Sequence, residues 1–355
     1  MKFRFLKYGS PVIVYLLAFL SFTHSGLLTW LALIYAWVLI PFTELLLSPQ
    51  NRNLDAAEEA IAKNDRMYDF VLYGMILLIY PALFFFLHSL AEKPAIPVLI
   101  GRIATMGLLC GVFGINLGHE LGHRSRSWEK LLAKAGLLSS LYLHFFIEHN
   151  RGHHKNVATP EDPASARLGE SVYHFYVRTI IYSYTDAWRI ANREQRKKGK
   201  AVFGFSNEMV RYQLIELGFL LGIFYFSGLR ITCCYLGAAF IGILLLETVN
   251  YIEHYGLSRK ITAAGNYERT LPVHSWNSNH VIGRLMLFEL SRHSDHHFLA
   301  SKKYQLLRHH QDAPQLPTGY PGMMLLALVP PVWFAVMEHR LKKYGFPSRK
   351  TSPAF

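Results

Sequence analysis

The stretch AIPVLIGRIATMGLLCGVFGINLGHELGHR, residues 95–124, joins an apolar run directly to two histidines spaced four residues apart. From 95 to 118 the run carries one charged residue, Arg102, and its length is close to the roughly 20 residues that a helix needs to cross a bilayer core. His119 and His123 follow where this helix would leave the membrane, and their spacing places them on one helical face. The stretch therefore predicts a membrane-spanning helix that ends in a metal site.

The string HELGH, residues 119–123, is also the pattern of a helical zinc protease site. His119 and His123 would then bind the metal, and Glu120 would act as the general base. Two histidines alone identify neither the metal nor the reaction, so the rest of the chain has to distinguish the alternatives.

The composition is that of a membrane protein. Hydrophobic residues make up 51% of the 355 residues and charged residues 17%, whereas soluble domains carry roughly 25% charged residues. We predict an all-α membrane protein, with one integral-membrane domain over residues 1–355; the alternative, core helices of a large soluble protein, fits this composition poorly. Its six transmembrane helices are expected at residues 11–24, 27–46, 70–90, 95–118, 212–229 and 231–252.

Basic residues predict the orientation of these spans. Lys2, Arg4 and Lys7 precede the first span, and most other lysines and arginines follow the second, fourth and sixth spans. The N-terminus resembles a signal peptide, but no small-residue cleavage site follows and the apolar run continues into a second span. Both termini and the two polar blocks, 119–210 and 253–355, are therefore expected on the cytoplasmic side.

Nine histidines form four clusters in or beside the polar blocks. On helices, His119 would share a face with His123, His149 with His153, and His293 with His296 and His297. A single catalytic zinc takes three protein ligands, so a protease would leave six of them unexplained. Two metals with four or five imidazoles each would use all nine, although imidazole binds Fe, Cu, Ni and Zn and does not fix the metal. The nine are His119 and His123; His149, His153 and His154; His254; and His293, His296 and His297.

Five motifs together carry a family resemblance: HELGHR (119–124), EHNRGHHKNVATPEDPASARLGES (148–171), NYIEHYGLSR (250–259), HSWNSNH (274–280) and LSRHSDHH (290–297). With them the chain resembles, over its whole length, the membrane-bound alkane 1-monooxygenases, which belong to the histidine-rich diiron hydroxylases and desaturases. The resemblance implies two non-haem iron ions held by the nine histidines. It also implies O2 and electrons from rubredoxin and its reductase, and a place in the bacterial cytoplasmic (inner) membrane.

The expected activity is that of a rubredoxin-dependent alkane 1-monooxygenase, which takes a linear hydrocarbon from the membrane lipid and hydroxylates its terminal methyl to a primary alcohol. A related diiron hydroxylase or desaturase, acting on another hydrocarbon or a fatty-acyl chain, is the alternative. The HxxxH and HxxxHH boxes of this chain differ from the wider first box and the HxxHH second box of desaturases.

The chain departs from the family pattern at Arg124, Ser291 and Phe298–Leu299, and these departures leave the preferred alkane chain length open. A membrane metal transporter would need more ionisable residues within the spans, and nothing points to a nucleic-acid partner.

Carboxylates beside the histidine boxes are candidates to accept an Nδ1–H bond from ligand imidazoles and so fix their tautomers. These are Glu120, Glu148, Glu253 and Asp295, and His274 and His280 are further candidates for a supporting role rather than ligands.

An alkane offers no polar group, so the shape of an apolar channel has to orient it. Trp37, in the middle of the second span, is a candidate for the floor of that channel or for simple packing. Gly111 and Gly114 leave room either for substrate or for close helix packing.

The electron donor is expected to be a separate protein. Cys110, Cys233 and Cys234 lie in apolar spans without a CxxC arrangement, which argues against a disulfide framework and against a fused iron–sulfur domain. The net charge of +13 would attract an acidic carrier. The basic segment 186–200 is either a docking site for it or a helix on the membrane surface.

Overall fold

The computed structural model describes residues 4–347, so Lys2 lies outside the described residues. Within this range the regular structure is helical apart from two isolated bridges, Ile261 with Tyr267 and Asn277 with Gln315. The all-α prediction is confirmed. Five helical stretches of the described chain are long and apolar enough to cross a membrane: Arg4–Thr23, Gly26–Leu46, Met67–Ser89, Ile96–Gly122 and Glu208–His254.

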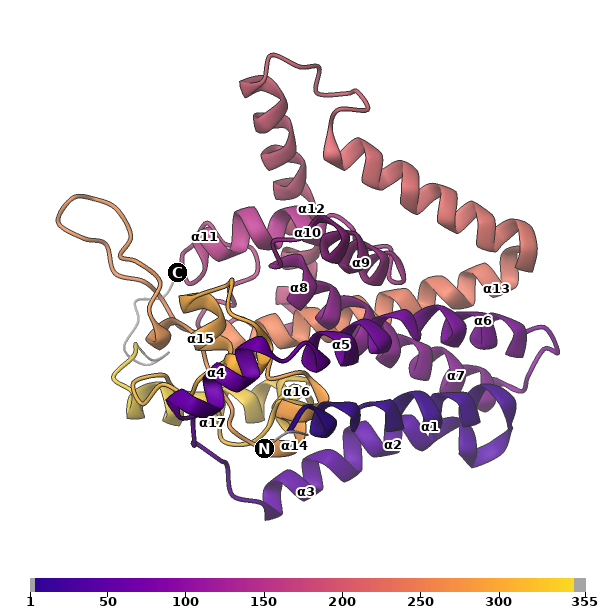
Figure 1. Ribbon diagram of the computed structural model, residues 1–355, viewed down its shortest axis with the longest axis horizontal. Helices are drawn as coiled ribbons and strands as arrows, with labels where there is room; N and C mark the ends of the chain where they lie inside the picture. Colours follow the sequence, from indigo (N-terminus) through magenta and orange to yellow (C-terminus); the bar gives the residue numbers. More distant parts are fainter. Residues whose placement is uncertain (1–3, 348–355) are drawn as a thin grey trace. The chain divides into compact units, whose positions relative to one another are not determined.

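The last of these stretches, α13 (Glu208–His254), contains both the fifth and the sixth predicted span. Gly228 interrupts it with φ 76° and ψ 170°, a conformation that is essentially confined to glycine. The two arms, 208–227 and 229–254, meet there at a sharp corner (Figure 1). The break falls beside the predicted boundary between the two spans.

The described chain divides into two compact units, each of which is built from separate segments. Unit 1 contains the residues up to Val38, Asp65–Gly152 and Tyr184–Leu246, and unit 2 contains Leu39–Asn64, His153–Ser183 and the residues from Glu247 onward.

Unit 1 is built around the helical run Ile96–Gly122, which consists of α7 (Ile96–Leu109), the π-helical turn η4 (Cys110–Ile115) and α8 (Asn116–Gly122). Glycines allow two neighbours to approach this run closely. A Cβ on Gly111 would lie 3.3 Å from the Gly242 carbonyl of α13, and a Cβ on Gly118 would lie 3.0 Å from the Ala133 carbonyl of α9. Unit 1 also holds α1 (Val12–Thr23), α2 (Leu31–Ile34), α5 (Met67–Leu77), α6 (Ile79–Ser89), α9 (Ser127–Leu138), α10 (Phe145–Glu148) and the C-terminal part of α12 (Val172–Lys197).

Arg102, the charged residue of the fourth predicted span, binds three backbone carbonyls of other segments. Its Nε donates to Ser21 (3.1 Å), Nη1 to Ser89 (2.6 Å) and Nη2 to His24 (2.8 Å). These carbonyls lie at the C-terminal ends of α1 and α6, where the helix dipole is negative. The guanidinium therefore ties three helices of unit 1 together.

Unit 2 packs around a group of buried aromatic rings next to His254. The Trp333 ring lies 5.1 Å from that of Tyr251 and 5.3 Å from that of Tyr255, and the Trp276 Nε1 donates to the Tyr255 carbonyl (2.9 Å). This packing holds the end of α13 in place. The other helices of unit 2 are α3 (Ile40–Leu46), α4 (Ala56–Asn64), α11 (His154–Asn156), α14 (Val281–Met286), α15 (His293–Phe298), α16 (Tyr320–Ala327), α17 (Pro330–Lys343) and the first part of α12.

Glu44, the one acid of the second predicted span, is buried in unit 2. Its Oε1 accepts a hydrogen bond from the Gly283 amide of α14 (2.7 Å). A Cβ on Gly319, at the start of α16, would overlap the same carboxylate. The carboxylate thus lies at the N-terminal ends of two helices, where negative charge is favourable. One of them, α14, directly precedes the segment that carries His293, His296 and His297.

Candidate metal centre

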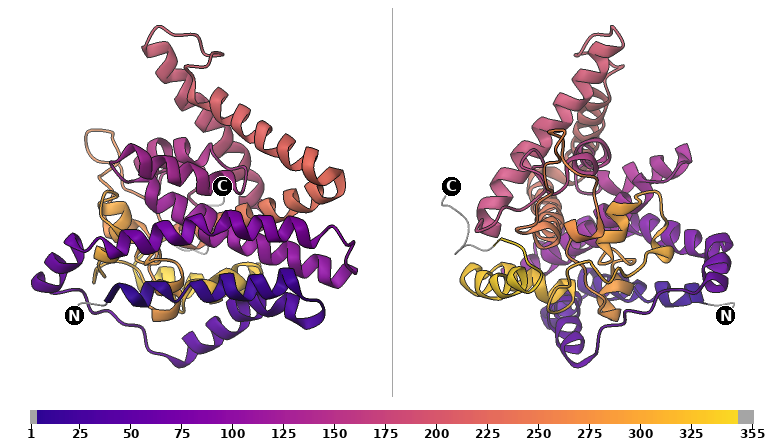
Figure 2. Two further views of the ribbon diagram at one scale, coloured as in Figure 1. Left: turned by 45° about the vertical axis from the view of Figure 1, so that its right-hand side comes forward. Right: turned by 90° about the vertical axis from the view of Figure 1, so that its left-hand side faces the viewer.

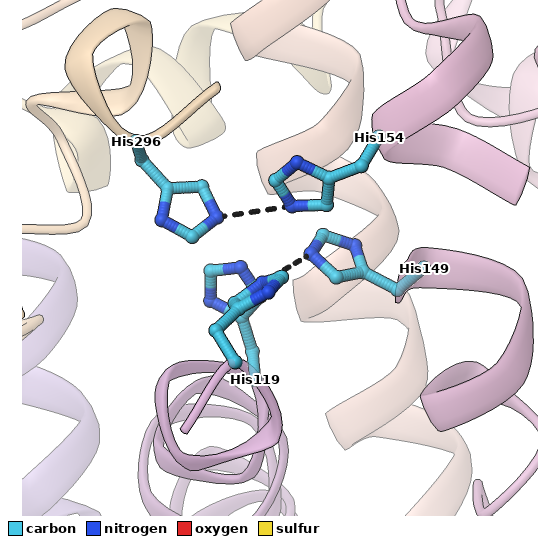
Figure 3. A group of neighbouring side chains, drawn as sticks. His119, His149, His154 and His296 are labelled. Carbon is cyan, nitrogen blue, oxygen red and sulfur yellow. Dashed lines mark hydrogen bonds between the residues drawn. The ribbon is translucent and has the colours of Figure 1, made fainter. Parts of the chain in front are cut away.

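Unit 1 brings three of the predicted ligands together. His119 and His123 lie at the end of α8, and His149 begins the π-helical turn η5 (His149–His153). The Nε2 atoms of His123 and His149 are 3.2 Å apart, and the ring centroids of His119 and His149 are 4.4 Å apart. Phe145 stacks on His149 with its ring centroid 4.7 Å away. Figure 3 shows the His119 and His149 rings turned toward each other from their two helices.

Glu120, the general base of the protease alternative, is bound to a buried arginine. Its Oε1 lies 2.8 Å from Nη2 of Arg124, whose Nη1 lies 3.2 Å from Oδ1 of Asp69. Burial alone would lower the pKa of Arg124, but Glu120 and Asp69 outweigh burial and raise it. This ion pair engages the carboxylate that a protease would need to activate water.

Unit 2 contains a complete group of four imidazoles. They are His153 at the end of η5, His254 at the end of α13, and His293 and His297 on α15, and all four are buried. The Nε2 atoms of His153 and His297 are 3.1 Å apart, and those of His254 and His293 are 3.2 Å apart. One nitrogen from each ring lies within 4.8 Å of the nitrogens of the other three.

These separations fit imidazoles that share one metal ion. With metal–nitrogen bonds of about 2.1 Å, two ligands at right angles would place their nitrogens about 3.0 Å apart, and the observed pairs are 3.1 and 3.2 Å apart. A metal also needs neutral imidazoles, because protonation removes the lone pair that binds it. Burial, followed by the neighbouring His293, His154, His153 and His254 rings, lowers the pKa of His297 well below its usual value. The donor set therefore fits a bound transition metal.

His154 and His296 form a separate pair in unit 2, and their Nε2 atoms are 3.2 Å apart (Figure 3). His154 follows His153 directly and His296 precedes His297 directly, yet the Nε2 atoms pair as His154 with His296 and as His153 with His297. The expectation of a shared face is therefore wrong for His149 and His153 in the second cluster, which pair with His123 and His297, and for the histidines of the fourth cluster. His149 and His153 lie at the two ends of the π-helical turn η5, whose period differs from the 3.6 residues of the α-helix that the prediction assumed. In the fourth cluster, residues 296 and 297 are about 100° apart around an α-helix.

Asp162, which the sequence analysis did not single out, orients His153. Its Oδ2 lies 2.8 Å from Nδ1 of His153 and accepts a hydrogen bond from the Ser165 hydroxyl (2.6 Å), while Oδ1 accepts one from the Ala164 amide (3.1 Å). Burial alone would raise the pKa of Asp162, but the His153 ring and the Ser165 hydroxyl outweigh burial and lower it. The carboxylate can thus hold a proton on Nδ1 and leave Nε2 free to bind metal.

Arg178 on α12 holds the loop that carries Asp162. Its Nη1 donates to the Pro163 carbonyl and Nη2 to the Ser165 carbonyl, each at 3.0 Å. The same guanidinium binds Glu170 at both carboxylate oxygens, at 2.7 and 2.8 Å. Four hydrogen bonds from one side chain therefore fix the 163–170 turn beside His153.

Glu253 contacts a predicted ligand, but on a different nitrogen from the one we expected. Its Oε2 lies 3.2 Å from Nε2 of His293, the same nitrogen that faces His254. The carboxylate is therefore on the metal side of the ring rather than on the Nδ1 side.

The other predicted supporting residues bind different partners. Asp295 accepts hydrogen bonds from Lys302, the Arg308 amide and His310. His274 contacts Glu268 (3.2 Å), and His280 contacts Ser278 (3.0 Å). Glu148 is buried just before His149, and Gly152 leaves space for its carboxylate.

The three candidates for the substrate channel have different surroundings. Trp37 is half-buried. Gly111 and Gly114 lie against neighbouring helices, which favours packing over a channel role for these two.

Comparison with known proteins gives one family match and several similar monooxygenases. The model of the fatty acid desaturase family matches residues 93–327. The chain is 38% identical over 307 residues to an alkane 1-monooxygenase of Acinetobacter baylyi, which covers 86% of this chain and 74% of that protein. It is 46% identical over 245 residues to alkane 1-monooxygenase 1 of Pseudomonas aeruginosa, which covers 69% of this chain and 64% of that protein. A xylene/toluene monooxygenase hydroxylase component of Pseudomonas putida is 29% identical over 239 residues, covering 67% of this chain and 63% of that protein.

The family match includes all nine histidines, from His119 to His297, and the similarity to the A. baylyi protein extends over most of the chain. The predicted resemblance is confirmed, and the chain belongs to the fatty acid desaturase family and to the alkane 1-monooxygenases.

Proposed function

We propose that the protein hydroxylates the terminal methyl of linear alkanes to primary alcohols, with O2 as oxidant. The observation that carries this proposal is the buried group of four imidazoles in unit 2, whose nitrogens face one another at metal-ligand spacing. The names of the relatives supply the substrate class: an alkane for the A. baylyi and P. aeruginosa proteins, and an aromatic hydrocarbon for the P. putida component.

Two non-haem irons are proposed as the cofactor. His153, His254, His293 and His297 would hold one of them. The remaining ligands of the nine, namely His119, His123, His149, His154 and His296, would hold the other. The tight spacing within each smaller set supports this division: His123 lies close to His149, and His154 lies close to His296. Bound iron would supply the one-electron chemistry that activates O2, which zinc cannot provide.

The protein's own residues prepare the site for this chemistry. Asp162 is placed to hold the proton of His153 on Nδ1, and burial lowers the pKa of His297 well below its usual value. Burial of the four unit 2 rings also limits the access of water. Each turnover consumes one alkane, one O2, two electrons and two protons, and yields one alcohol and one water.

The membrane arrangement is proposed to include six spans, with both termini and the histidines on the cytoplasmic side of the inner membrane. The Gly228 corner supports separate fifth and sixth spans, since it divides α13 into two arms. The basic residues of the polar blocks support the orientation.

The electron donor is proposed to be rubredoxin, reduced by its reductase. The described cysteines are all free thiols and none lies in a CxxC arrangement, which supports delivery of the electrons by a carrier outside this chain. The excess of positive charge would favour an acidic partner.

Reconstitution of the purified protein in lipid with iron, rubredoxin, its reductase and a series of linear alkanes tests the proposal. We expect primary alcohols, identified by mass spectrometry, and close to two irons per chain. Alkenes as the main product would indicate a desaturase instead. Active protein that contains one zinc and no iron would contradict the proposal outright.

A further inference from the structure

Two exposed residues of the described chain directly follow predicted histidine ligands. Among the residues that directly precede or follow the nine histidines, Lys155 and Phe298 are exposed, and the others are buried or half-buried. Lys155 follows His154, and Phe298 follows His297. A protein bound at these two residues would lie one residue along the chain from two of the ligands.

A hairpin of unit 2, residues 257–271, borders both points. The Arg259 Nη1 donates to the Lys155 carbonyl (2.9 Å), and the Arg269 guanidinium lies over the Phe298 ring, 5.2 Å from its centroid. The bridge between Ile261 and Tyr267 closes the hairpin, which projects in orange at the left of Figure 1 and is visible again in the left view of Figure 2.

The surface around these two points combines apolar side chains with a mainly basic rim, to which Glu161 and Glu268 add two acids. Ile261, Phe298 and Leu299 are 67%, 37% and 50% exposed, and Lys155, Lys260 and Arg269 are exposed beside them. These six residues are called the carrier patch below. An apolar centre with a charged rim is the usual anatomy of a protein interface. The exposed charges also keep the patch out of the hydrocarbon of a membrane.

We propose that the carrier patch is the docking site of a small acidic one-electron carrier protein, which passes its electrons toward His297 and His154. The inference rests on the proposed function, because only a reaction that consumes electrons needs such a partner. For each alcohol formed, two carrier molecules dock in turn and each is oxidised by one electron, while the two protons come from water.

An anionic lipid surface would also complement the basic rim. The patch favours a carrier, because it lies where the chain neighbours of the ligands reach the surface. Lipid bound there would cover two exposed residues that directly follow ligands.

Charge reversal of the rim tests the proposal. The full-length, iron-loaded protein in nanodiscs would be compared with the double variant Lys260→Glu/Arg269→Glu, and oxidation of reduced acidic rubredoxin would be followed at limiting concentrations. We expect the apparent KM for the carrier to rise about tenfold at low salt and the salt dependence to flatten, because rim charges mainly steer association. Ile261→Ser should raise the same KM about threefold at low and at high salt alike.

The matched control is Arg193→Glu/Lys197→Glu, which reverses two charges of the 186–200 segment in unit 1. It should leave the apparent KM for the carrier within about twofold of the wild-type value. A rise with this control and none with the patch variant would place docking on α12 and overturn the proposal. Unchanged KM in the patch variant, together with weaker binding to vesicles of anionic lipid, would assign the patch to the membrane and likewise overturn it.

A carrier-independent reaction separates this test from that of the proposed function. Protein reduced with dithionite, freed of reductant and mixed with O2 and octane should form octanol equally in the wild type and the patch variant. If the wild type formed no octanol, the proposed function would fail. Calorimetric measurement of rubredoxin binding to the wild type and to the patch variant would still show whether rubredoxin docks on the carrier patch.

Discussion

The Nδ1 atom of His153 lies 2.8 Å from Oδ2 of Asp162, and both side chains are buried. A carboxylate in this position fixes the tautomer and direction of a ligand imidazole and makes its other nitrogen a stronger donor. Ser165 and the Ala164 amide hold Asp162 in turn, so residues of the protein itself orient His153.

Replacement of Asp162 by Asn should weaken metal binding, because a neutral amide holds the imidazole proton less strongly than a carboxylate does. Loss of such a partner typically costs about 10 to 100-fold in metal affinity. Iron retained per chain, measured against increasing chelator, should fall at correspondingly lower chelator concentrations. Glu161→Gln, at the exposed neighbouring position, is the control and should behave as wild type. Equal iron retention in the Asp162 and Glu161 variants would show that the hydrogen bond does not support the metal.

Replacement of Glu120 by Gln distinguishes the two interpretations of HELGH. The change removes the ion pair with Arg124 (2.8 Å) beside His119 and His123 but leaves every imidazole in place. Alkane hydroxylation should therefore drop about 10 to 100-fold without being abolished, as measured by alcohol formed per iron. Peptide cleavage by the wild type that disappears in this variant would instead establish a protease.

His144 should make stability depend on pH. Burial lowers its pKa to about 3, and its Nε2 has no hydrogen-bond partner among residues 4–347. The unfolded residue takes up a proton below about pH 6.5 while the folded one stays neutral, so unfolding becomes more favourable as the pH falls from about 6.5 toward about 3. At pH 5 this difference is worth about 2 kcal/mol.

The variant His144→Leu should therefore lose about 2 kcal/mol less unfolding free energy between pH 7 and pH 5 than the wild type does. Denaturant titrations of metal-free protein in detergent would measure the two losses. His339→Leu, at an exposed position, should lose as much as the wild type. Identical losses in the wild type and the His144 variant would mean that His144 is already charged in the folded protein.

Replacement of Trp37 by Ser tests the candidate floor of the substrate channel. Trp37 lies in the π-helical turn η3 (Tyr35–Leu39) and is half-buried. If its ring ends the channel, the smaller side chain should shift the product profile toward longer alcohols, as gas chromatography of an alkane mixture would show. An unchanged profile would leave Trp37 as a packing residue and would not affect the proposed chemistry. The exposed neighbour Val38, changed to Ser, is the control.

Much of the architecture could be predicted from local sequence patterns. The apolar runs predict the long helices because length and hydropathy are local properties, and the histidine spacing points to more than one metal because nine imidazoles exceed the needs of one. The helix-breaking Gly228 lies next to the predicted boundary between the fifth and sixth spans.

The partners of the carboxylates could not be predicted in the same way. Asp162 reaches His153 through a turn whose shape depends on Arg178, a residue of another element. Glu253 and Asp295 sit beside histidines in the sequence, yet one contacts Nε2 of His293 and the other binds Lys302 and His310. Neighbours in the chain do not determine which side of a ring a carboxylate faces, and the π-helical geometry of η5 leaves no signal in residue spacing.

The three hydrogen bonds of Arg102 bear on how the protein is assembled during synthesis. The helix that carries this arginine uses its own carbonyls internally, so it cannot satisfy the guanidinium while it stands alone in lipid. The acceptors belong to segments made earlier, Ser21 and His24 at the end of α1 and Ser89 at the end of α6. Full burial of the helix that leads to His119 must therefore follow the insertion of those segments, and the first histidine box reaches its final position only after the N-terminal helices have gathered around it.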